Sequence, residues 1–397
     1  MAQPSSLRIN VVVGGRFHAS QLYEGLTDLG HDVHIYAASP ARYFRSVPRG
    51  KVTFVPKPAQ LLQKGLNLRG PRWLAEWSAV AFDWLVSRIM RPADVVWGFN
   101  GDSCFAALKA KERGSVYICD RACPHILSQE QLLQTESTFI GYPYEAHTRR
   151  TLSRFLTEYE MADRIVVPSR YSAGSFPVHG IDLSRVAIAP LDANAPESAG
   201  HESEPAKLHF EGISENDIVV GMVGGAFLRK GIIYLLRAVD ALARPDIRIV
   251  LRASEANVLR HDEARRLCVK LGVIFVPYLN DINSFYRSVD MFVLPSVDEG
   301  FGMVLYEALR NGTPVIASSH VGAIDGMTPD REFIEVPAQD AEALGHAIER
   351  LADDPDLRRS MGNAGRVFHS ARLVNGGHYR KALAKILQDT VGPQRAL

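Results

Sequence analysis

The sequence predicts an α/β protein that consists of two doubly wound, Rossmann-like domains facing each other across a cleft. Three observations predict this fold class. The chain has 397 residues, more than one hydrophobic core usually organises, and 46% of them are hydrophobic. Apolar, strand-like runs alternate with amphipathic helical segments along the chain. The alternation is interrupted near residue 200 by a polar segment rich in Pro, Ser and Glu.

The expected strands have the apolar, β-branched composition of strands buried in parallel sheets. Before the polar segment they are LRINVVV, DVHIYAA, KVTFVP, DVVWGFN, SVYICD, RIVVPS and VAIAP, and after it they are DIVVGMVGG, IRIVLRA, VIFVP, MFVLPS, PVIAS and FIEV. We therefore expect one domain over residues 1–195 and a second over residues 206–375. The amphipathic sequence YRKALAKILQDTV predicts a last helix within residues 376–397, which could cross back to the first domain.

Composition argues against several functional classes. The formal charge is +1 and the pI is near 7.8, so nothing indicates a nucleic-acid partner. There is no run of about 18 apolar residues and no signal-peptide pattern, so we expect a cytoplasmic protein.

Cys119, Cys123 and His125 lie close in sequence, but a zinc centre needs a fourth ligand and Cys119 ends an apparently buried strand. We therefore expect no metal.

The first expected strand runs into Gly14 and Gly15, and a helix follows at about residues 19–29. A glycine pair allows a ligand to approach the backbone closely. The full dinucleotide fingerprint is missing, and no acidic residue ends the strand DVHIYAA, as an NAD ribose would require. We therefore discount a dehydrogenase and expect both glycines to lie near the phosphates or the sugar of a ligand.

Residues 33–75 form a basic stretch without Asp or Glu, and the next helix carries an apolar stripe that includes Trp73, Trp77 and Trp84. Two interpretations are open. Basic charge beside interfacial tryptophans is typical of contact with anionic lipid or with a lipid-linked, phosphate-bearing substrate. Alternatively the tryptophans fill the domain core and the charges are solvated, and the sequence favours this second interpretation by a small margin.

The sequence VGGAFLRKG, residues 223–231, follows the first strand of the second domain and precedes a helix. Gly224 and Gly225 permit close approach of a ligand to the backbone. Arg229 and Lys230 could reach over the cleft and neutralise a diphosphate that gains charge as it leaves. By itself this loop is also compatible with an ordinary solvated helix end.

A second strand-turn-helix carries two carboxylates, in SVDEGFGMVLYEALRNGTPVIA. Amides at Gly302, Met303 and Val304 would lie at the positive end of the helix dipole and form an anion site. Glu307 lies about one turn further on and leans back toward the helix start, where it could hold a ribose hydroxyl pair. Glu299 would lie on the other side of the anion, where the sugar attached to a diphosphate would lie.

This segment resembles the E-x(7)-E signature of the retaining glycosyltransferases of family 4, which have the GT-B fold. The matching residues are Glu299, Gly300, Phe301, Gly302, Glu307, Ala308, Gly312, Thr313 and Pro314. The resemblance implies that Glu299 faces the donor sugar and that Glu307 holds the nucleotide ribose. Many members have an arginine where this chain has Gly225, and we expect Arg229 to supply that charge.

The resemblance extends to the first domain. Gly14 and Gly15 resemble the family's opening glycine loop, which lies near the donor. Similar enzymes have a histidine in the loop after the fifth strand, near the donor sugar. The resemblance implies this role for His125, and Asp120 is the alternative residue for it. The segment FLTEYEMADRIVVPSRYSAGSF resembles the family's E-x-x-x-A-D-x-I-x-V-P-S run, in which Ser169 ends a strand at the cleft. We expect Glu158 and Asp163 of this segment to be helix-terminal and structural.

The resemblance implies a retaining glycosyltransferase that moves a sugar from a nucleoside-diphosphate sugar to a hydroxyl acceptor, in glycan or glycolipid assembly. No cofactor or metal is expected, and a lipid-linked acceptor and peripheral contact with an anionic membrane stay open. The alternatives are a GT-B-fold nucleotide-sugar epimerase or phosphorylase and a non-catalytic nucleotide-sugar-binding protein. The expected catalytic residues are Glu299, His125 and Lys230, and the expected donor-binding residues are Gly14, Gly15, Arg229, Lys230, Gly302, Met303, Val304 and Glu307.

Overall fold

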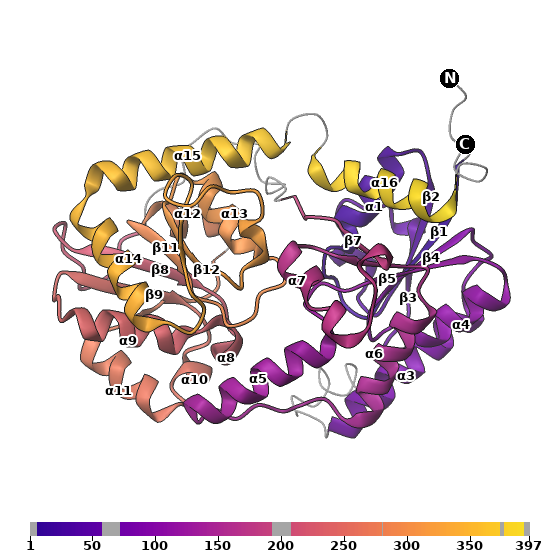
Figure 1. The fold of residues 1–397 in the computed structure, drawn as a ribbon, viewed down its shortest axis with the longest axis horizontal. Coiled ribbons are helices and arrows are strands. Elements are labelled where there is room, and N and C mark those ends of the chain that lie inside the picture. Colours follow the sequence, from indigo (N-terminus) through magenta and orange to yellow (C-terminus); the bar gives the residue numbers. More distant parts are fainter. Residues whose placement is uncertain (1–5, 58–71, 193–207, 280, 374–376, 393–397) are drawn as a thin grey trace.

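A computed structural model contains two parallel β-sheets, each with helices on both faces (Figure 1). The structure describes residues 6–57, 72–192, 208–279, 281–373 and 377–392. The expected α/β fold with two doubly wound, Rossmann-like domains is thereby confirmed. The polar segment that we expect to separate the domains, residues 193–207, lies outside the described residues.

The first sheet has seven strands in the order β3-β2-β1-β4-β5-β6-β7. The strands are β1 (Arg8–Val13), β2 (Asp32–Ala37), β3 (Val52–Phe54), β4 (Val95–Phe99), β5 (Val116–Asp120), β6 (Arg164–Val167) and β7 (Val186–Ile188). The helices of this half are α1 (Ala19–Asp28), α3 (Arg72–Ile89), α4 (Cys104–Glu112), α5 (Ile126–Ile140), α6 (Arg149–Met161) and α7 (Arg170–Gly174).

The second sheet has six strands in the order β10-β9-β8-β11-β12-β13. The strands are β8 (Ile218–Val223), β9 (Ile247–Arg252), β10 (Ile274–Phe275), β11 (Met291–Leu294), β12 (Val315–Ser318) and β13 (Ile334–Val336). The helices that follow β8 along the chain are α8 (Phe227–Lys230), α9 (Ile232–Leu242), α10 (Glu255–Val258), α11 (Asp262–Leu271), α12 (Ile282–Arg287), α13 (Met303–Arg310), α14 (Ala341–Asp353), α15 (Pro355–Leu373) and α16 (His378–Val391).

Strand order determines where loops gather. In the first domain, strands β1 to β3 are added toward one edge of the sheet, and β4 and the later strands toward the other edge, so the strand order reverses between β1 and β4. In the second domain it reverses in the same way between β8 and β11. Ligands of open α/β sheets bind at such switch points, beyond the carboxyl ends of the strands. The segments that follow the strands at these points contain Gly14 and Asp102 in the first domain and Lys230, at the end of α8, and Glu299 in the second.

The last helix, α16, lies against the first domain (Figure 1). Its apolar face buries Leu383 among core residues of that domain, including Leu22 of α1. The Asp192 carboxylate accepts hydrogen bonds from the amides of His378 and Tyr379 at the start of the helix. Because α15 packs on α13 of the second domain, the chain crosses between the domains before α16 begins.

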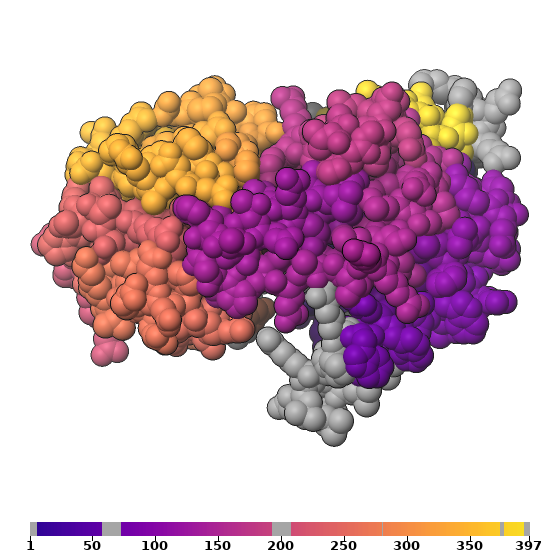
Figure 2. Space-filling view, turned by 60° about the horizontal axis from the view of Figure 1, so that its bottom comes forward, coloured from indigo at the N-terminus to yellow at the C-terminus, as the bar shows by residue number. Residues whose placement is uncertain are grey.

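Helix α5 makes a second crossing, in the opposite direction. It follows β5 of the first sheet, yet Leu133 and Ile140 are buried in the core of the second domain. Tyr234 Oη donates to Glu136 Oε1 at 2.8 Å, and the Ile140 carbonyl lies 2.6 Å from His261 Nε2. In Figure 2 the purple segment that includes α5 abuts the salmon-coloured second domain.

The tryptophans of α3 are not core residues, so the interpretation that the sequence favoured is wrong. Trp73, Trp77 and Trp84 are 66%, 52% and 47% exposed. The helix packs on the sheet through another face, on which Phe82 and Val86 are buried. Among the described residues, no helix is both long and apolar enough to cross a bilayer.

Candidate functional site

Helix α8, which follows β8, and the loop after β11 bring Lys230 and Glu299 together. Lys230 Nζ lies 2.5 Å from Glu299 Oε2, and Arg229 Nη2 lies 3.4 Å from Glu299 Oε1. Glu299 is 8% exposed. Burial alone would raise the pKa of its carboxyl, but the charges of Lys230 and Arg229 outweigh burial and hold that pKa below its usual value. The site therefore contains an ionised carboxylate between two cations.

The turn after Glu299 leads into α13 through Gly302, whose φ of +101° lies in the left-handed region that favours glycine. Met303 and Val304 form the first turn of the helix. Amides in a first helical turn have no acceptor within the helix, and the helix dipole favours an anion beside them. The structure thus brings the start of α13 next to Glu299, and the role of these residues in donor binding stays a prediction.

Glu307 lies in the second turn of α13 and is half-buried. Its Oε2 accepts a hydrogen bond of 2.8 Å from Tyr286 Oη, a buried group on α12. This bond orients one carboxylate oxygen and leaves the other with capacity to accept further hydrogen bonds. The position fits the expected contact with a ribose, which stays a prediction.

The two domains meet beside this turn. Ser169 Oγ, at the start of α7, donates to the Gly300 carbonyl at 2.7 Å. The Asp298 carboxylate accepts from Tyr171 Oη at 3.1 Å and from the side-chain amide of Gln129. A Cβ added at Gly300 would lie 2.0 Å from the Ala122 carbonyl oxygen, so the backbones approach as closely as a glycine allows.

The loop after β5 reaches the site through Cys123, whose Sγ lies 3.8 Å from Arg229 Nη1. The side chain of His125, two residues further on, does not reach this site. The His125 ring is buried, its Nδ1 caps α5 by accepting from the Leu127 amide, and it stacks on His179 with ring centroids 4.1 Å apart. The structure therefore does not bring this imidazole to Glu299 and Lys230, because capping α5 turns the ring into the first domain. Its catalytic role stays a prediction without support from this geometry.

The expected glycine loop of the first domain lies beside an ion pair. The Gly14 amide donates to Asp102 Oδ2 at 2.9 Å, and Lys57 Nζ lies 2.6 Å from Asp102 Oδ1. A Cβ on Gly14 would lie 2.1 Å from the Asp102 carboxylate, so glycine is required for this contact. Gly15 packs near the ring of Phe17. Asp102 and Phe17 also line a large cavity.

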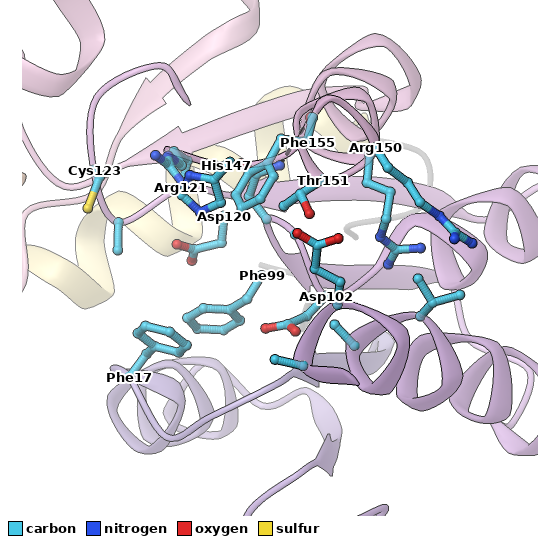
Figure 3. A pocket seen from close by; sticks show the side chains of 18 of the residues that line it. Phe17, Phe99, Asp102, Asp120, Arg121, Cys123, His147, Arg150, Thr151 and Phe155 are labelled. Atoms are coloured by element: carbon cyan, nitrogen blue, oxygen red, sulfur yellow. Dashed lines mark hydrogen bonds between the residues drawn. The ribbon is translucent and has the colours of Figure 1, made fainter. Parts of the chain in front are cut away.

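This cavity has a volume of about 480 Å³ and lies among the loops and helices of the first domain (Figure 3). Phe17 and Phe99 lie on one side, and His147, Arg150 and Thr151 lie on the other. The side chains that line it are both apolar and polar: Phe17, Phe99, Phe155, Ala75, Ala79, Val80, Ala122, Glu76, Asn100, Asp102, Asp120, Arg121, Glu145, His147, Arg150, Thr151 and Arg154. Cys123 also lines it, so the cavity extends to the residue that touches Arg229.

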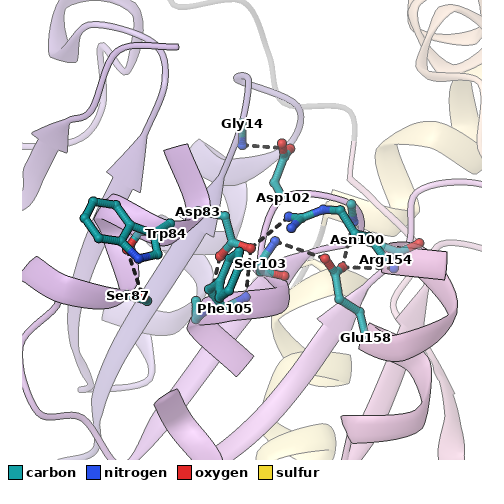
Figure 4. Close-up of polar contacts among 12 residues, drawn as sticks. Gly14, Asp83, Trp84, Ser87, Asn100, Asp102, Ser103, Phe105, Arg154 and Glu158 are labelled. Atoms are coloured by element: carbon teal, nitrogen blue, oxygen red, sulfur yellow. Dashed lines mark hydrogen bonds and ion pairs between the residues drawn. The ribbon is translucent and has the colours of Figure 1, made fainter. Parts of the chain in front are cut away.

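A buried polar network supports one wall of the cavity (Figure 4). The Glu158 carboxylate accepts from the amides of Gly101 and Ser103 and from the side chain of Asn100. Asp83 accepts from the first amides of α4 and pairs with Arg154. Burial raises the pKa of Glu158 to about 8, against the opposing effect of the Gly101 amide. This network is structural, as the sequence predicts for Glu158.

Several residues at the site have no motif that would reveal them. Asp298, Gln129 and Cys123 come from separate loops or helices and are neighbours only because the domains meet. Asp120, which the sequence analysis names as the alternative to His125, ends β5, accepts from Trp97 Nε1 at 2.9 Å and lines the cavity. In the described ranges, no three His, Cys, Asp or Glu side chains are arranged to hold a metal ion.

Comparison with known sequences identifies both halves of the chain. Residues 13–192 match the family described as glycosyl transferase 4-like domain, and residues 204–368 match glycosyl transferases group 1. An uncharacterized glycosyltransferase of Methanocaldococcus jannaschii is 27% identical over 219 residues, which cover 53% of this chain and 55% of that protein. A D-inositol 3-phosphate glycosyltransferase of Kribbella flavida is 31% identical over 223 residues, or 52% of each chain. The matched segment thus spans about half the length of these relatives.

Solved structures agree with the fold over almost the whole chain. The structure of Anabaena HepE in complex with UDP superposes with a TM-score of 0.65 and 15% sequence identity, covering 96% of this chain and 99% of that one. At this identity the likeness bears on the fold alone. The two family matches, together with the GT-B arrangement, establish that the chain belongs to the group 1 glycosyltransferases and carries a glycosyl transferase 4-like domain in its first half.

Proposed function

We propose that this protein is a retaining glycosyltransferase that transfers a sugar from a nucleoside-diphosphate sugar to a hydroxyl acceptor bound in the cavity of the first domain. The observation that carries the proposal is the ion pair of Lys230 with Glu299 next to the start of α13. In this proposal Lys230, Arg229 and the amides of α13 receive the diphosphate. Glu307 holds the ribose, while Glu299 orients the sugar.

The chemical step breaks the bond between the anomeric carbon and the diphosphate oxygen. The diphosphate leaves with the electron pair and gains negative charge, which Lys230, Arg229 and the helix terminus stabilise. The acceptor oxygen forms the new bond on the same face of the sugar, and its proton passes to the departing diphosphate. The close contact of the domains at Gly300 supports exclusion of water from this step.

The cavity of the first domain suits an acceptor with both polar and apolar parts. Asp102 and Asp120 can accept hydrogen bonds from hydroxyl groups, and Phe17 and Phe99 offer apolar surface. The cavity extends to Cys123, which touches Arg229, so an acceptor bound there would lie beside the expected diphosphate site.

The donor is tested by thermal stabilisation of the full chain with UDP, GDP, ADP and their common sugars. A ligand that binds only the folded protein raises stability by RT ln(1 + [L]/Kd). We expect one nucleotide to raise the melting temperature of the native protein and to lose this effect in Lys230→Ala. If no nucleotide shifts either protein, the assignment of the diphosphate site fails.

Product analysis separates the two catalytic alternatives. A nucleotide-sugar epimerase would isomerise the donor without an acceptor, and a phosphorylase would yield a sugar phosphate. Transfer to an added acceptor with the anomeric configuration kept, measured by NMR coupling constants, is the expected result. An inverted product would contradict the retaining mechanism, and binding without any turnover would favour a nucleotide-sugar-binding protein.

We propose further that the acceptor is lipid-linked and that α3 contacts an anionic membrane surface at the cytoplasmic face. The exposed side of α3 combines Trp73, Trp77 and Trp84 with Arg88, whose guanidinium lies 5.4 Å from the Trp84 ring centre. Aromatic rings beside basic groups are typical of peripheral helices at the membrane interface. Ala79 and Val80 of the same helix line the acceptor cavity, so membrane contact would bring a lipid-linked acceptor to its entrance.

Sedimentation with vesicles tests this contact. We expect the native protein to co-sediment with vesicles that contain anionic lipid at low salt, and Trp73→Ser/Trp77→Ser to bind much less. Leu373→Ser, which removes a partly exposed apolar residue of α15, is the matched control. Equal sedimentation of the native protein and the tryptophan variant would contradict the role of α3.

A further inference from the structure

A second cavity, of about 500 Å³, lies at the amino-terminal ends of the strands of the second sheet. The Lys230 and Glu299 site lies at the opposite, carboxyl-terminal ends. It is formed by the segments that lead into β11 and β12, by the ends of α12 and α13 and by α15 from its start to Arg366. These segments precede their strands, whereas Glu299 follows β11. The cavity is therefore separate from the site described above, and its volume lies in the range of small-molecule sites.

Arginines dominate the lining of this cavity. They are Arg287, Arg310, Arg358, Arg359 and Arg366. The one acidic residue among the lining residues is Asp290, and its Oδ2 already accepts from the Val219 amide at 2.8 Å. The cavity thus carries a large excess of positive charge in a chain whose formal net charge is only +1.

The hydrogen bonds of these arginines go largely to neutral oxygen atoms. Arg287 Nε donates to Asn311 Oδ1 at 3.0 Å, and Arg366 Nη2 donates to Asn363 Oδ1 at 2.8 Å. Arg358 donates to backbone carbonyls at the end of α14. Arg359 pairs with Asp356, and Arg310 lies near Glu307. Neutral acceptors thus fix the guanidinium groups of Arg287, Arg358 and Arg366 without cancelling their charge.

Close packing holds this arrangement in place. A Cβ on Gly362 of α15 would lie 2.1 Å from the Gly312 carbonyl oxygen, so α15 lies directly on the turn before β12. The Arg366 guanidinium carbon lies 3.7 Å from the Cβ position of Gly312. Thr313 Oγ1 donates to the Tyr286 carbonyl at 2.8 Å and ties the turn to α12. The cavity walls are therefore preformed.

Arginines often satisfy carbonyls at helix ends, and α12 and α13 do end at Arg287 and Arg310. That role accounts for about one cation per helix end, whereas here arginines from three helices line one cavity. Guanidinium groups bind phosphate through paired N–H donors. We propose that this cavity binds a phosphate-bearing small molecule, at a site distinct from the donor site and independent of the proposed transferase function.

Isothermal titration calorimetry with inorganic pyrophosphate tests this site on the full chain. The Lys230→Ala background is used, because it removes the lysine expected to bind a diphosphate at the other site. We expect this protein still to bind pyrophosphate, and the added changes Arg287→Gln/Arg366→Gln to weaken that binding about tenfold or more, since each removes a charge-assisted hydrogen bond.

The control Arg265→Gln/Arg350→Gln removes the same charge from exposed arginines of α11 and α14 and should leave binding unchanged. Circular dichroism and melting curves verify the fold of each variant. Titration with orthophosphate and with a sugar phosphate distinguishes a free anion from a phosphate ester. The site is refuted if the Lys230→Ala protein binds none of these probes, or if Arg287→Gln/Arg366→Gln binds them as tightly as the control.

Discussion

Lys230 is held by charge rather than by packing, because its ammonium group lies 2.5 Å from the buried Glu299 carboxylate. In Lys230→Ala, Arg229 at 3.4 Å still compensates Glu299, so we expect a loss of stability of only about 1–3 kcal/mol. The loss of one group that stabilises the departing charge should lower kcat roughly 100- to 1000-fold. Steady-state kinetics with the donor found by thermal stabilisation provide the measurement.

Lys270→Ala is the matched control for this variant, because Lys270 pairs with Asp240 on an exposed surface of the same domain. It should retain full activity. Full turnover by Lys230→Ala would mean that the ion pair has only a structural role.

His125 is predicted to make stability depend on pH. Burial, reinforced by His179 and Arg121, lowers its pKa to about 3, whereas an unfolded histidine titrates near 6.5. As pH falls below about 6.5, His125 binds a proton in the unfolded chain but stays neutral in the folded protein. Stability is therefore lost from about pH 6.5 downward, by up to about 1.4 kcal/mol per pH unit from this residue.

The variant His125→Asn isolates this effect, because Asn does not titrate and is a good N-cap for α5. Urea unfolding of both proteins between pH 7 and pH 5 gives the comparison. We expect a shallower decline for His125→Asn. Parallel declines would show that the histidine is accessible to protons in the folded state.

Helix α16 is predicted to stabilise a domain from which it is distant in sequence. Leu383 is fully buried against α1, where a Cβ on Gly25 would lie 2.7 Å from its Cδ1. Leu383→Ala should lower the free energy of unfolding by about 2–5 kcal/mol, because the closely packed helices cannot collapse onto the gap. Denaturant unfolding measures this loss. Val367→Ala on α15, where the side chain is 67% exposed, should change stability little, and equal effects of both variants would contradict the docking of α16.

Strands and glycine turns could be predicted from sequence because both depend on local signals. The apolar run MFVLPS and the glycines of the next turn suffice to indicate β11, the loop and α13. Helix α5 carries no comparable signal for the core on which it packs, since Leu133 would fit either domain. The orientation of His125 depends on the start of that helix. The exposure of Trp73 depends on which face of α3 meets the sheet, and the sequence allowed both.

The two domains are linked by more than their connecting segment. Helix α5 extends from the first domain onto the second, and α16 returns from the second to the first (Figure 1). Between them, Ser169 and Tyr171 hold the turn that carries Glu299. A change in this contact should therefore affect both the arrangement of the domains and the chemistry at the cleft, while each domain core stays intact.

Gly300→Ala tests this coupling. The added Cβ would lie 2.0 Å from the Ala122 carbonyl oxygen, closer than atoms can pack, so a backbone of one domain must move away. A shift of about 1 Å at a reacting centre can cost about 100-fold in rate. We expect a similar loss of activity, together with a larger radius of gyration by small-angle X-ray scattering and unchanged circular dichroism. Gly174→Ala on α7 adds the same methyl group where nothing lies within 4 Å, and should match the native protein in both measurements. Native scattering and native activity in Gly300→Ala would mean that the domains do not need this contact to form the site.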